Sequence, residues 1–125
     1  MRMGRESRKK GNAGEDFAVK LLEEKGYRIL CRNFKGAHGE IDIIGEKDSY
    51  IVFTEVKTRK ILSQKPVFSV DDKKLKHIVD TAEEFMTEYK DNNYISSLLL
   101  RFDVVEVYTD GEKILSSKHI ENILA

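Results

Sequence analysis

The chain has 125 residues, of which 22 are Lys or Arg and 22 are Asp or Glu, so its formal net charge at pH 7 is zero. Its hydrophobic content of 40% suits one globular domain that buries roughly two-thirds of the surface of its unfolded chain. No apolar run reaches the ~18 residues of a membrane-spanning helix, and none follows the basic N-terminus, so we expect neither a signal peptide nor a membrane partner. The lone cysteine, Cys31, excludes an internal disulfide framework and favours a cytoplasmic protein.

The charges are unevenly distributed along the chain. Residues 1–12 carry five basic side chains and one acidic one, and residues 57–77 carry seven and two, whereas residues 78–125 carry four and ten. One cationic face on an acidic body would explain these counts, and a mixed, solvated surface explains them equally well. We expect residues 1–12 to form a basic, flexible N-terminal tail and residues 13–125 to form a single domain.

Hydrophobic periodicity predicts a helix from about Ala13 to Lys25, ended by the stop signal Gly26. Glu15 lies seven residues before Leu22, at the edge of the apolar stripe of this helix. A carboxylate at the border of a buried face is a candidate site residue, although a plain surface charge is the commoner explanation. The remaining members of the stripe are Gly14, Phe17, Ala18 and Leu21.

Three strands are predicted next, at Tyr27–Asn33, Glu40–Gly45 and Tyr50–Arg59, and a short turn joins the second and third as a hairpin. The loop before the hairpin contains two glycines but lacks the lysine and spacing of a phosphate-binding loop.

A second helix is predicted to begin near Ser69, an N-cap with Asp72 three residues later. A buried strand at Leu98–Tyr108 and a turn at Thr109–Gly111 lead to a final strand near Lys113–Leu115. The order α-β-β-β-α-β-β predicts an α/β fold with a mixed sheet. The apolar face of the second helix comprises Leu75, Ile78, Val79, Ala82, Phe85, Met86 and Tyr89.

The hairpin carries charged residues where an ordinary sheet needs none. Successive side chains of a strand alternate between its faces. Two registers are open, pairing Tyr50 with Gly45 or with Lys47, and the second places Asp42 directly across from Glu55. Two carboxylates roughly 5 Å apart repel each other unless a cation lies between them.

A divalent cation suits this position, because Mg²⁺ binds carboxylate and carbonyl oxygens and bridges to phosphate. Lys57 follows Glu55 by two residues and therefore lies on the same face, within reach of a phosphate oxygen or an attacking water. Glu15 could complete the metal shell or bind the metal through water. These residues suit phosphodiester hydrolysis, in which the ion polarises the phosphoryl group. A cross-strand ladder of ion pairs is the competing explanation.

Several segments resemble the YraN-type proteins of bacteria: GEDFAVKLLEEKGYRILCRNF, GEIDII, FTEVKTRK, SVDDKKLKHIVDTA and RFDVVEV. That family is placed in the PD-(D/E)XK nuclease superfamily, near the archaeal Holliday-junction resolvases. The resemblance extends from about Asn12 to the C-terminus. The combination of GEID, EVK-x-R and RFDVV is far more specific than a bare D…ExK pattern.

The resemblance implies a restriction-endonuclease-like fold, in which helices flank a central mixed β-sheet and the site lies on the hairpin. Asp42 matches the metal-binding aspartate of the superfamily, and Glu55 matches its second acidic ligand. Lys57 matches the catalytic lysine, and Glu15 matches the glutamate of the first helix. By the same analogy the backbone carbonyl of Val56 is a further metal ligand.

The role of Glu40, in the GEID motif, is open: it binds the metal through water, or it pairs with Lys57, Arg59 or Arg101. Arg59 and Lys60 are candidates to hold phosphates, since basic side chains beside a cleavage site position the backbone without reading sequence.

Lys74 occupies the position where the family usually has a lysine followed by glutamine. Leu75 replaces that glutamine here, which puts the contribution of the second helix to the site in question. Arg101 and Asp103 share a strand face and are expected to form a structural ion pair.

The function we expect is a metal-dependent endonuclease that uses Mg²⁺ or Mn²⁺ on branched or otherwise structured DNA. The alternative is a non-catalytic nucleic-acid-binding module of a DNA repair or recombination complex. A protein-interaction domain is a third class, favoured by the zero net charge. By analogy with the resolvases, two copies are expected to act as a homodimer.

Overall fold

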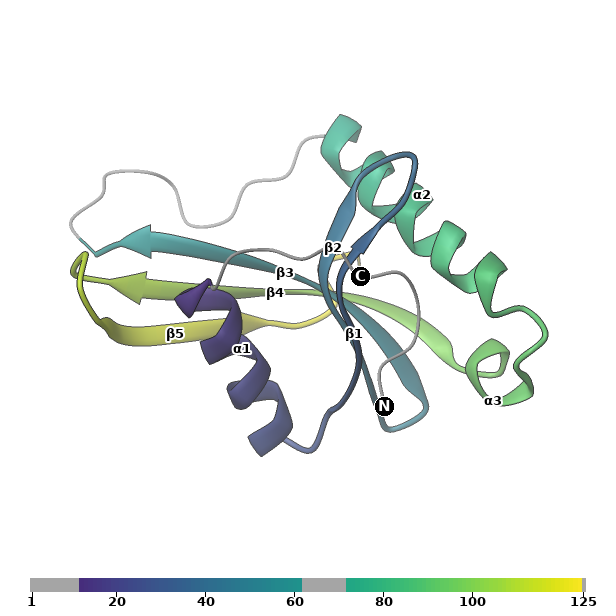
Figure 1. The fold of residues 1–125 in the computed structure, drawn as a ribbon, viewed down its shortest axis with the longest axis horizontal. Helices are drawn as coiled ribbons and strands as arrows, with labels where there is room; N and C mark the ends of the chain where they lie inside the picture. The colour runs from purple at the N-terminus through teal and green to yellow at the C-terminus, as the bar shows by residue number, and fades with distance from the viewer. Residues whose placement is uncertain (1–11, 62–71, 125) are drawn as a thin grey trace.

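The computed structural model describes residues 12–61 and 72–124. Five strands form one sheet in the order β1-β2-β3-β4-β5, in which β3 and β4 run parallel and the other neighbours run antiparallel. The predicted α/β fold, a mixed sheet flanked by helices, is thereby confirmed (Figure 1). No helix in these residues is long and apolar enough to cross a membrane. The elements are α1 (Ala13–Glu24), β1 (Arg28–Lys35), β2 (Glu40–Lys47), β3 (Tyr50–Lys60), α2 (Asp72–Glu88), α3 (Asn93–Ser96), β4 (Leu99–Thr109) and β5 (Ile114–Ile120).

The two long helices cover opposite faces of the sheet, and each face has its own core. On β3, Val52 and Val56 pack in the hydrophobic core between the sheet and α1, called the core of α1 below. Ile51 and Phe53 pack in the hydrophobic core between the sheet and α2, called the core of α2. This alternation follows from the two-residue period of a strand. Even-numbered residues of β3 therefore face α1, and odd-numbered residues of β3 face α2.

The start of α1 is held against β3. The Asn12 side chain caps the helix by accepting the N–H of Glu15 at 3.0 Å. Gly14 is buried, and a Cβ at this position would lie 2.2 Å from Thr58 Oγ1. The helix ends one residue earlier than predicted, before Gly26, whose φ of 95° lies in the left-handed region.

The apolar face predicted for α2 is confirmed, since Ile78, Ala82 and Phe85 are buried in the core of this helix. The predicted N-cap, Ser69, lies outside the described residues. The four-residue helix α3 was not predicted, because its only signal is the Asn92 side chain, which accepts the N–H of Ile95. Strand β5 is longer than predicted, because its residues, none of them fully buried, are held as a strand by pairing with β4.

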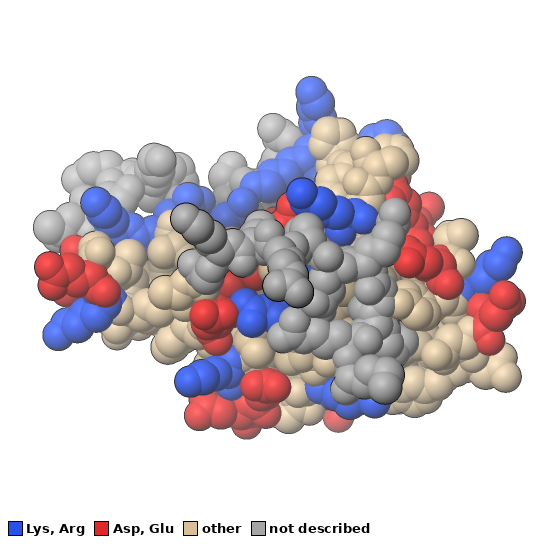
Figure 2. All heavy atoms as spheres, in the orientation of Figure 1, with Lys and Arg blue, Asp and Glu red and all other residues tan. Residues whose placement is uncertain are grey.

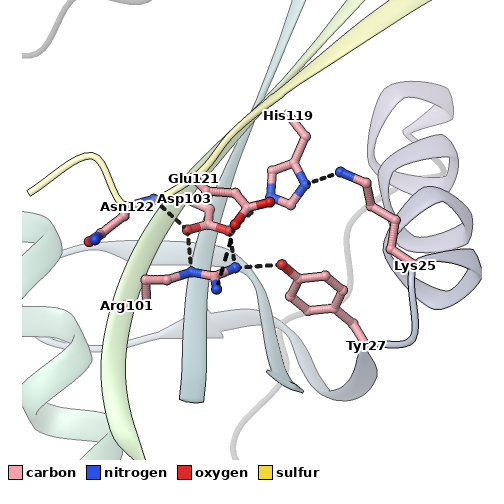
Figure 3. Close-up of polar contacts among 7 residues, drawn as sticks. All are labelled: Lys25, Tyr27, Arg101, Asp103, His119, Glu121 and Asn122. Carbon is pink, nitrogen blue, oxygen red and sulfur yellow. Dashed lines mark hydrogen bonds and ion pairs between the residues drawn. The ribbon is translucent and has the colours of Figure 1, made fainter. Parts of the chain in front are cut away.

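Arg101 and the buried Asp103 form the predicted structural ion pair on the α1 side of the sheet (Figure 3). Two guanidinium nitrogens donate to the Asp103 carboxylate, at 3.0 and 2.8 Å. The same carboxylate accepts the N–H of Asn122 at 2.9 Å and His119 Nε2 at 2.8 Å. One buried acid thus ties β4, β5 and the C-terminal segment together.

His119 links this cluster to the end of α1. Lys25 Nζ lies 2.7 Å from His119 Nδ1 (Figure 3). An ammonium group has only donors, so Nδ1 accepts this bond and Nε2 carries the proton donated to Asp103. The cluster therefore needs no metal or substrate to account for its contacts, and its role is structural.

Candidate functional site

The hairpin adopts the register that pairs Lys47 with Tyr50, one of the two registers left open by the sequence. Residues 48–49 form its turn, and both have φ in the left-handed region, as a two-residue hairpin turn requires. Extending this register by one step past the last backbone pair sets Asp42 across from Glu55.

The backbone pairing between β2 and β3 stops at Ile43 and Thr54. Just beyond, Asp42 Oδ2 accepts the backbone N–H of Val56 at 2.8 Å. Strand β3 continues to pair with β4 as far as Lys60. The two strands of the hairpin therefore part at the position where the predicted site residues lie.

Glu55 is the most perturbed acid of this region. Its pKa is raised to about 7, first by burial and then by the charge of Asp42 and, more weakly, Glu40; Lys57 and Lys74 oppose the rise. Its Oε1 atom is buried and has no hydrogen-bond partner in the described part of the chain. A buried carboxylate with a raised pKa and an oxygen without a hydrogen bond is typical of a site that binds a cation or a proton.

Lys57 faces a second lysine. Its pKa is lowered, first by burial and then by the side-chain contact and positive charge of Lys74, while Glu55 and Asp42 oppose the change. Lys74 lies in the first turn of α2. The helix thus brings a cation to the hairpin even though Leu75 replaces the family's glutamine. Two adjacent ammonium groups favour an anion between them.

The charged row continues an apolar one. Ile51 and Phe53 point toward the core of α2, and the next odd-numbered residues of β3 on that face are Glu55, Lys57 and Arg59. Lys60 has the opposite parity and approaches the turn at Gly111. The two predicted phosphate contacts, Arg59 and Lys60, therefore lie on different faces of β3.

Glu15 is wholly buried, and Arg32 Nη2 lies 3.6 Å from its Oε1. Glu15 belongs to α1, which covers the face of the sheet opposite to the one covered by α2. Among residues 12–61 and 72–124, no three His, Cys, Asp or Glu side chains are grouped closely enough to hold a metal ion. The arrangement does not gather Glu15 with Asp42 and Glu55 into one metal shell, and its role as a ligand stays a prediction.

The residues present nevertheless fit a hard divalent cation. Asp42 and Glu55 supply oxygen atoms, and the buried Glu55 Oε1 has no donor within the described residues. Mg²⁺ is commonly bound by one or two carboxylates and keeps several waters, so a third acidic side chain is not required. The carbonyl of Val56 stays a predicted ligand.

Comparison with known proteins gives the family of this chain. The model of the uncharacterised protein family UPF0102 matches residues 14–107. The chain belongs to the UPF0102 family. The resemblance to YraN-type proteins is confirmed at this level.

The following relatives are each named only as a UPF0102 protein. The relative from Fervidobacterium nodosum is 42% identical over 118 residues, which cover 94% of this chain and 83% of the relative. That from Caldicellulosiruptor bescii is 47% identical over 103 residues, covering 82% and 84%. That from Treponema pallidum is 39% identical over 101 residues, covering 80% and 78%. These names state a family and no activity.

Glu106 is a charged residue beside the site that sequence reasoning overlooked. It is completely buried, on the strand that pairs in parallel with β3, and its register partner is Lys57. Its Oε1 accepts the hydroxyl of Tyr108 at 2.9 Å, and its Oε2 has no hydrogen-bond partner among the described residues. The available signal was a single acid inside the apolar run Val104–Val107.

Proposed function

We propose that this protein is a metal-dependent endonuclease of the PD-(D/E)XK type, hydrolysing phosphodiester bonds in branched or otherwise structured DNA. One observation carries the proposal: Asp42, Glu55 and Lys57 meet where β2 and β3 part, and the buried Glu55 Oε1 has no partner among the described residues. An ion-pair ladder would leave this acid neither with a raised pKa nor with an unused oxygen.

Asp42 and Glu55 are the residues that would hold Mg²⁺ or Mn²⁺, with the Val56 carbonyl and Glu15 as the further ligands expected from the resemblance. The bound ion would polarise the phosphoryl group and make water a better nucleophile at neutral pH. Glu40 contributes negative charge close to Glu55, which favours a cation there.

The two lysines act on the phosphate rather than on the metal. Lys57 and Lys74 approach each other from β3 and α2, so a phosphate between them is contacted from two sides. Their charge offsets the negative charge that grows on the phosphoryl oxygens in the transition state. Lys57 also lies close enough to the acids to orient the attacking water.

The surface around the site supports a nucleic-acid partner. Figure 2 shows basic side chains along the upper edge of the molecule, from the far ends of β3–β5 toward the first turn of α2. Phosphate contacts by such side chains hold a nucleic acid without reading its sequence. Arg59 on the α2 side and Lys60 on the other side could grip phosphates on either side of the end of β3.

A second function is favoured by a specific observation. Because the adjacent Lys57 and Lys74 can hold a phosphate without a bound metal, a non-catalytic nucleic-acid-binding module of a repair or recombination complex also fits the site. The resolvase resemblance adds a homodimer, since cutting a junction needs paired incisions. A single, buried cysteine, Cys31, accords with a cytoplasmic protein.

The deciding experiment incubates the pure protein with labelled linear duplex, single strand, flap and four-way junction, in DNA and RNA forms. Each substrate is tested with Mg²⁺, Mn²⁺ or EDTA, beside Asp42→Asn and Lys57→Ala proteins. We expect metal-dependent cutting of a branched DNA that both substitutions abolish. Binding without cutting establishes the non-catalytic module, and the absence of both overturns the two functions together. Light scattering with and without the junction tests the homodimer.

A further inference from the structure

Two of the buried polar atoms that have no hydrogen-bond partner within residues 12–61 and 72–124 lie on neighbouring strands beside the proposed active site. They are Arg59 Nε on β3 and Glu106 Oε2 on the adjacent β4. Leaving a buried donor or acceptor unpaired costs free energy, so such atoms are rare and call for an explanation. The explanation for Glu55 was a cation, but Arg59 is itself a cation and its Nε can only donate.

The strand register places these groups in one cluster. Arg59 pairs with Tyr108, and Glu106 lies opposite Lys57 on β3 and opposite Lys118 on β5. Residues that pair across strands share a face of the sheet. This face is the one that carries Phe53 and Phe102 in the core of α2, because their register continues into these pairs.

One hydrogen bond and one pKa shift show that Tyr108 lies between Glu106 and Arg59. The Tyr108 hydroxyl donates to Glu106 Oε1 at 2.9 Å. The pKa of Tyr108 is raised, first by burial and then by Glu106, while the positive charge of Arg59 opposes the rise. Glu106 and Arg59 are therefore both close enough to Tyr108 to act on its hydroxyl group. One buried carboxylate lies among three basic residues, Lys57, Arg59 and Lys118.

This excess of positive charge is suited to a second phosphate. Lys57 and Arg59 are two residues apart on one strand, so their Cα atoms are roughly 6.7 Å apart, close to the step between successive phosphates of a nucleic-acid strand. Arginine binds phosphate with two parallel N–H bonds. A phosphodiester at Arg59 would give its unpaired N–H an acceptor.

We propose that Arg59 binds the phosphodiester next to the scissile one, and that Glu106 is the positioning residue that orients Arg59 and Lys118 for it. The nucleic-acid strand then runs along β3 from Glu55 toward Lys60, over β4 and β5 and away from α2. This inference rests on the proposed nucleic-acid-binding function, and it assigns a role to the buried acid that cleavage itself does not use.

The test measures binding of a fluorescent four-way DNA junction in EDTA over a salt series, so that no cutting is needed. The variants are Arg59→Ala, Glu106→Gln and the double substitution. Lys20→Ala is the control, because Lys20 is an exposed residue of α1 and its substitution also removes one positive charge. We expect Arg59→Ala to lower the slope of log Kd against log salt by about 0.9, the value for one lost phosphate contact. Glu106→Gln should weaken binding of the wild type but not that of Arg59→Ala.

Tyr108→Phe provides a second route, since it removes the donor to Glu106 without changing charge. It should weaken binding only when Arg59 is present, and melting curves monitor folding of every variant. Unchanged slopes in Arg59→Ala, or equal losses from Glu106→Gln with and without Arg59, overturn the inference. A wild type that binds no junction in a salt-dependent way overturns it together with the proposed function. Binding with the expected slopes but without metal-dependent cutting supports it and overturns the endonuclease alone.

Discussion

The backbone N–H of Val56 donates to Asp42 Oδ2 at 2.8 Å, at the point where the β2–β3 backbone pairing stops. A carboxylate, rather than a strand carbonyl, therefore satisfies this N–H. Asp42 thus has two separable properties: it accepts a backbone hydrogen bond, and it places a negative charge beside Glu55.

Two substitutions separate these properties. Asp42→Asn keeps an acceptor for Val56 and removes the charge, so we expect its stability in EDTA to remain within about 1 kcal/mol of the wild type. Asp42→Ala leaves the N–H without its partner and should cost about 1–3 kcal/mol more. Both should abolish metal-dependent cutting. Urea unfolding and the junction assay measure the two effects, and an Asn variant that cuts normally would remove Asp42 from the metal site.

The raised pKa of Glu55 leads us to expect that the stability of the metal-free protein depends on pH. Burial, followed by the charge of Asp42, raises its pKa from 4.5 to about 7. An acid with a raised pKa contributes its stability below the unfolded value and loses it as pH rises through the folded value. The wild type in EDTA should therefore lose up to about 3 kcal/mol between pH 4.5 and pH 8 because of this residue.

The matched variant is Glu55→Gln, which has the same shape and no charge to bury. We expect it to be more stable than the wild type at pH 8 and similar to it at pH 4.5, by urea unfolding at both values. Adding Mg²⁺ should stabilise the wild type and not the variant. A pH-independent difference between the two proteins would contradict the raised pKa.

Lys74 and its neighbour Lys73 form a matched pair of lysines. Lys74 is half-buried against Lys57, whereas Lys73 is exposed on the same turn of α2. If Lys74 contacts the phosphate, Lys74→Ala should slow cutting by roughly ten- to a hundredfold, as expected for loss of a charge-assisted hydrogen bond. Lys73→Ala removes the same charge and should change the rate by less than about twofold. Equal effects would mean that only net charge matters.

Gly14 and Thr58 test how α1 is held against β3. A Cβ at Gly14 would lie 2.2 Å from Thr58 Oγ1, and the next nearest Thr58 atom is at 3.5 Å. Gly14→Ala should therefore destabilise the protein by about 1–3 kcal/mol through overpacking. Adding Thr58→Ala removes the clashing oxygen and should restore most of this loss. Additive effects of the two substitutions in urea unfolding would show that α1 is not seated here as described.

The lowered pKa of Asp103 leads us to expect that the fold loses stability at acidic pH. Burial would raise its pKa, but the hydrogen bonds from His119, Arg101 and Asn122 outweigh burial and hold the pKa below its ordinary 3.8. An acid with a lowered pKa stabilises the fold above its unfolded value, and this contribution is lost as pH falls through the folded value.

Asp103→Asn should have a free energy of unfolding about 3–5 kcal/mol below that of the wild type at pH 7, as for loss of one partner of a buried ion pair. As the pH falls below 4, the free energy of unfolding of this variant should decrease less than that of the wild type. Exposed Asp91→Asn is the control and should follow the wild-type curve. An Asp103→Asn protein with the wild-type acid dependence would show that another carboxylate governs unfolding at low pH.

Local pattern predicted most of the elements but not all their ends. The stripe Ile78–Phe85 and the alternation of β3 are strong signals because the buried side chains repeat with the period of the helix or strand. Strand β5 was predicted too short and helix α3 was not predicted, because β5 has no fully buried residue and α3 is a single turn. Their conformation depends on neighbouring chain more than on their own apolar residues.

The candidate site was predictable in part. Asp42, Glu55 and Lys57 lie on one hairpin, so strand parity alone limits their arrangement to a shared face. The contact of Lys74 with Lys57 could not be derived in this way, since it joins α2 to β3 across the fold. The same holds for Glu106, whose position beside Lys57 follows from the parallel pairing of β3 and β4.

The amino-acid sequence by itself determined the α/β class, the hairpin, the helix faces and the charged residues of the β3 row. These properties depend on residues a few positions apart, where bond geometry limits the choices. Only the tertiary structure decided the hairpin register, the parting of β2 and β3 at Asp42, the burial of Glu15 beside Arg32 and the burial of Glu106. Each of these depends on which distant segments pack together, and burial and strand pairing across the whole sheet determine that packing.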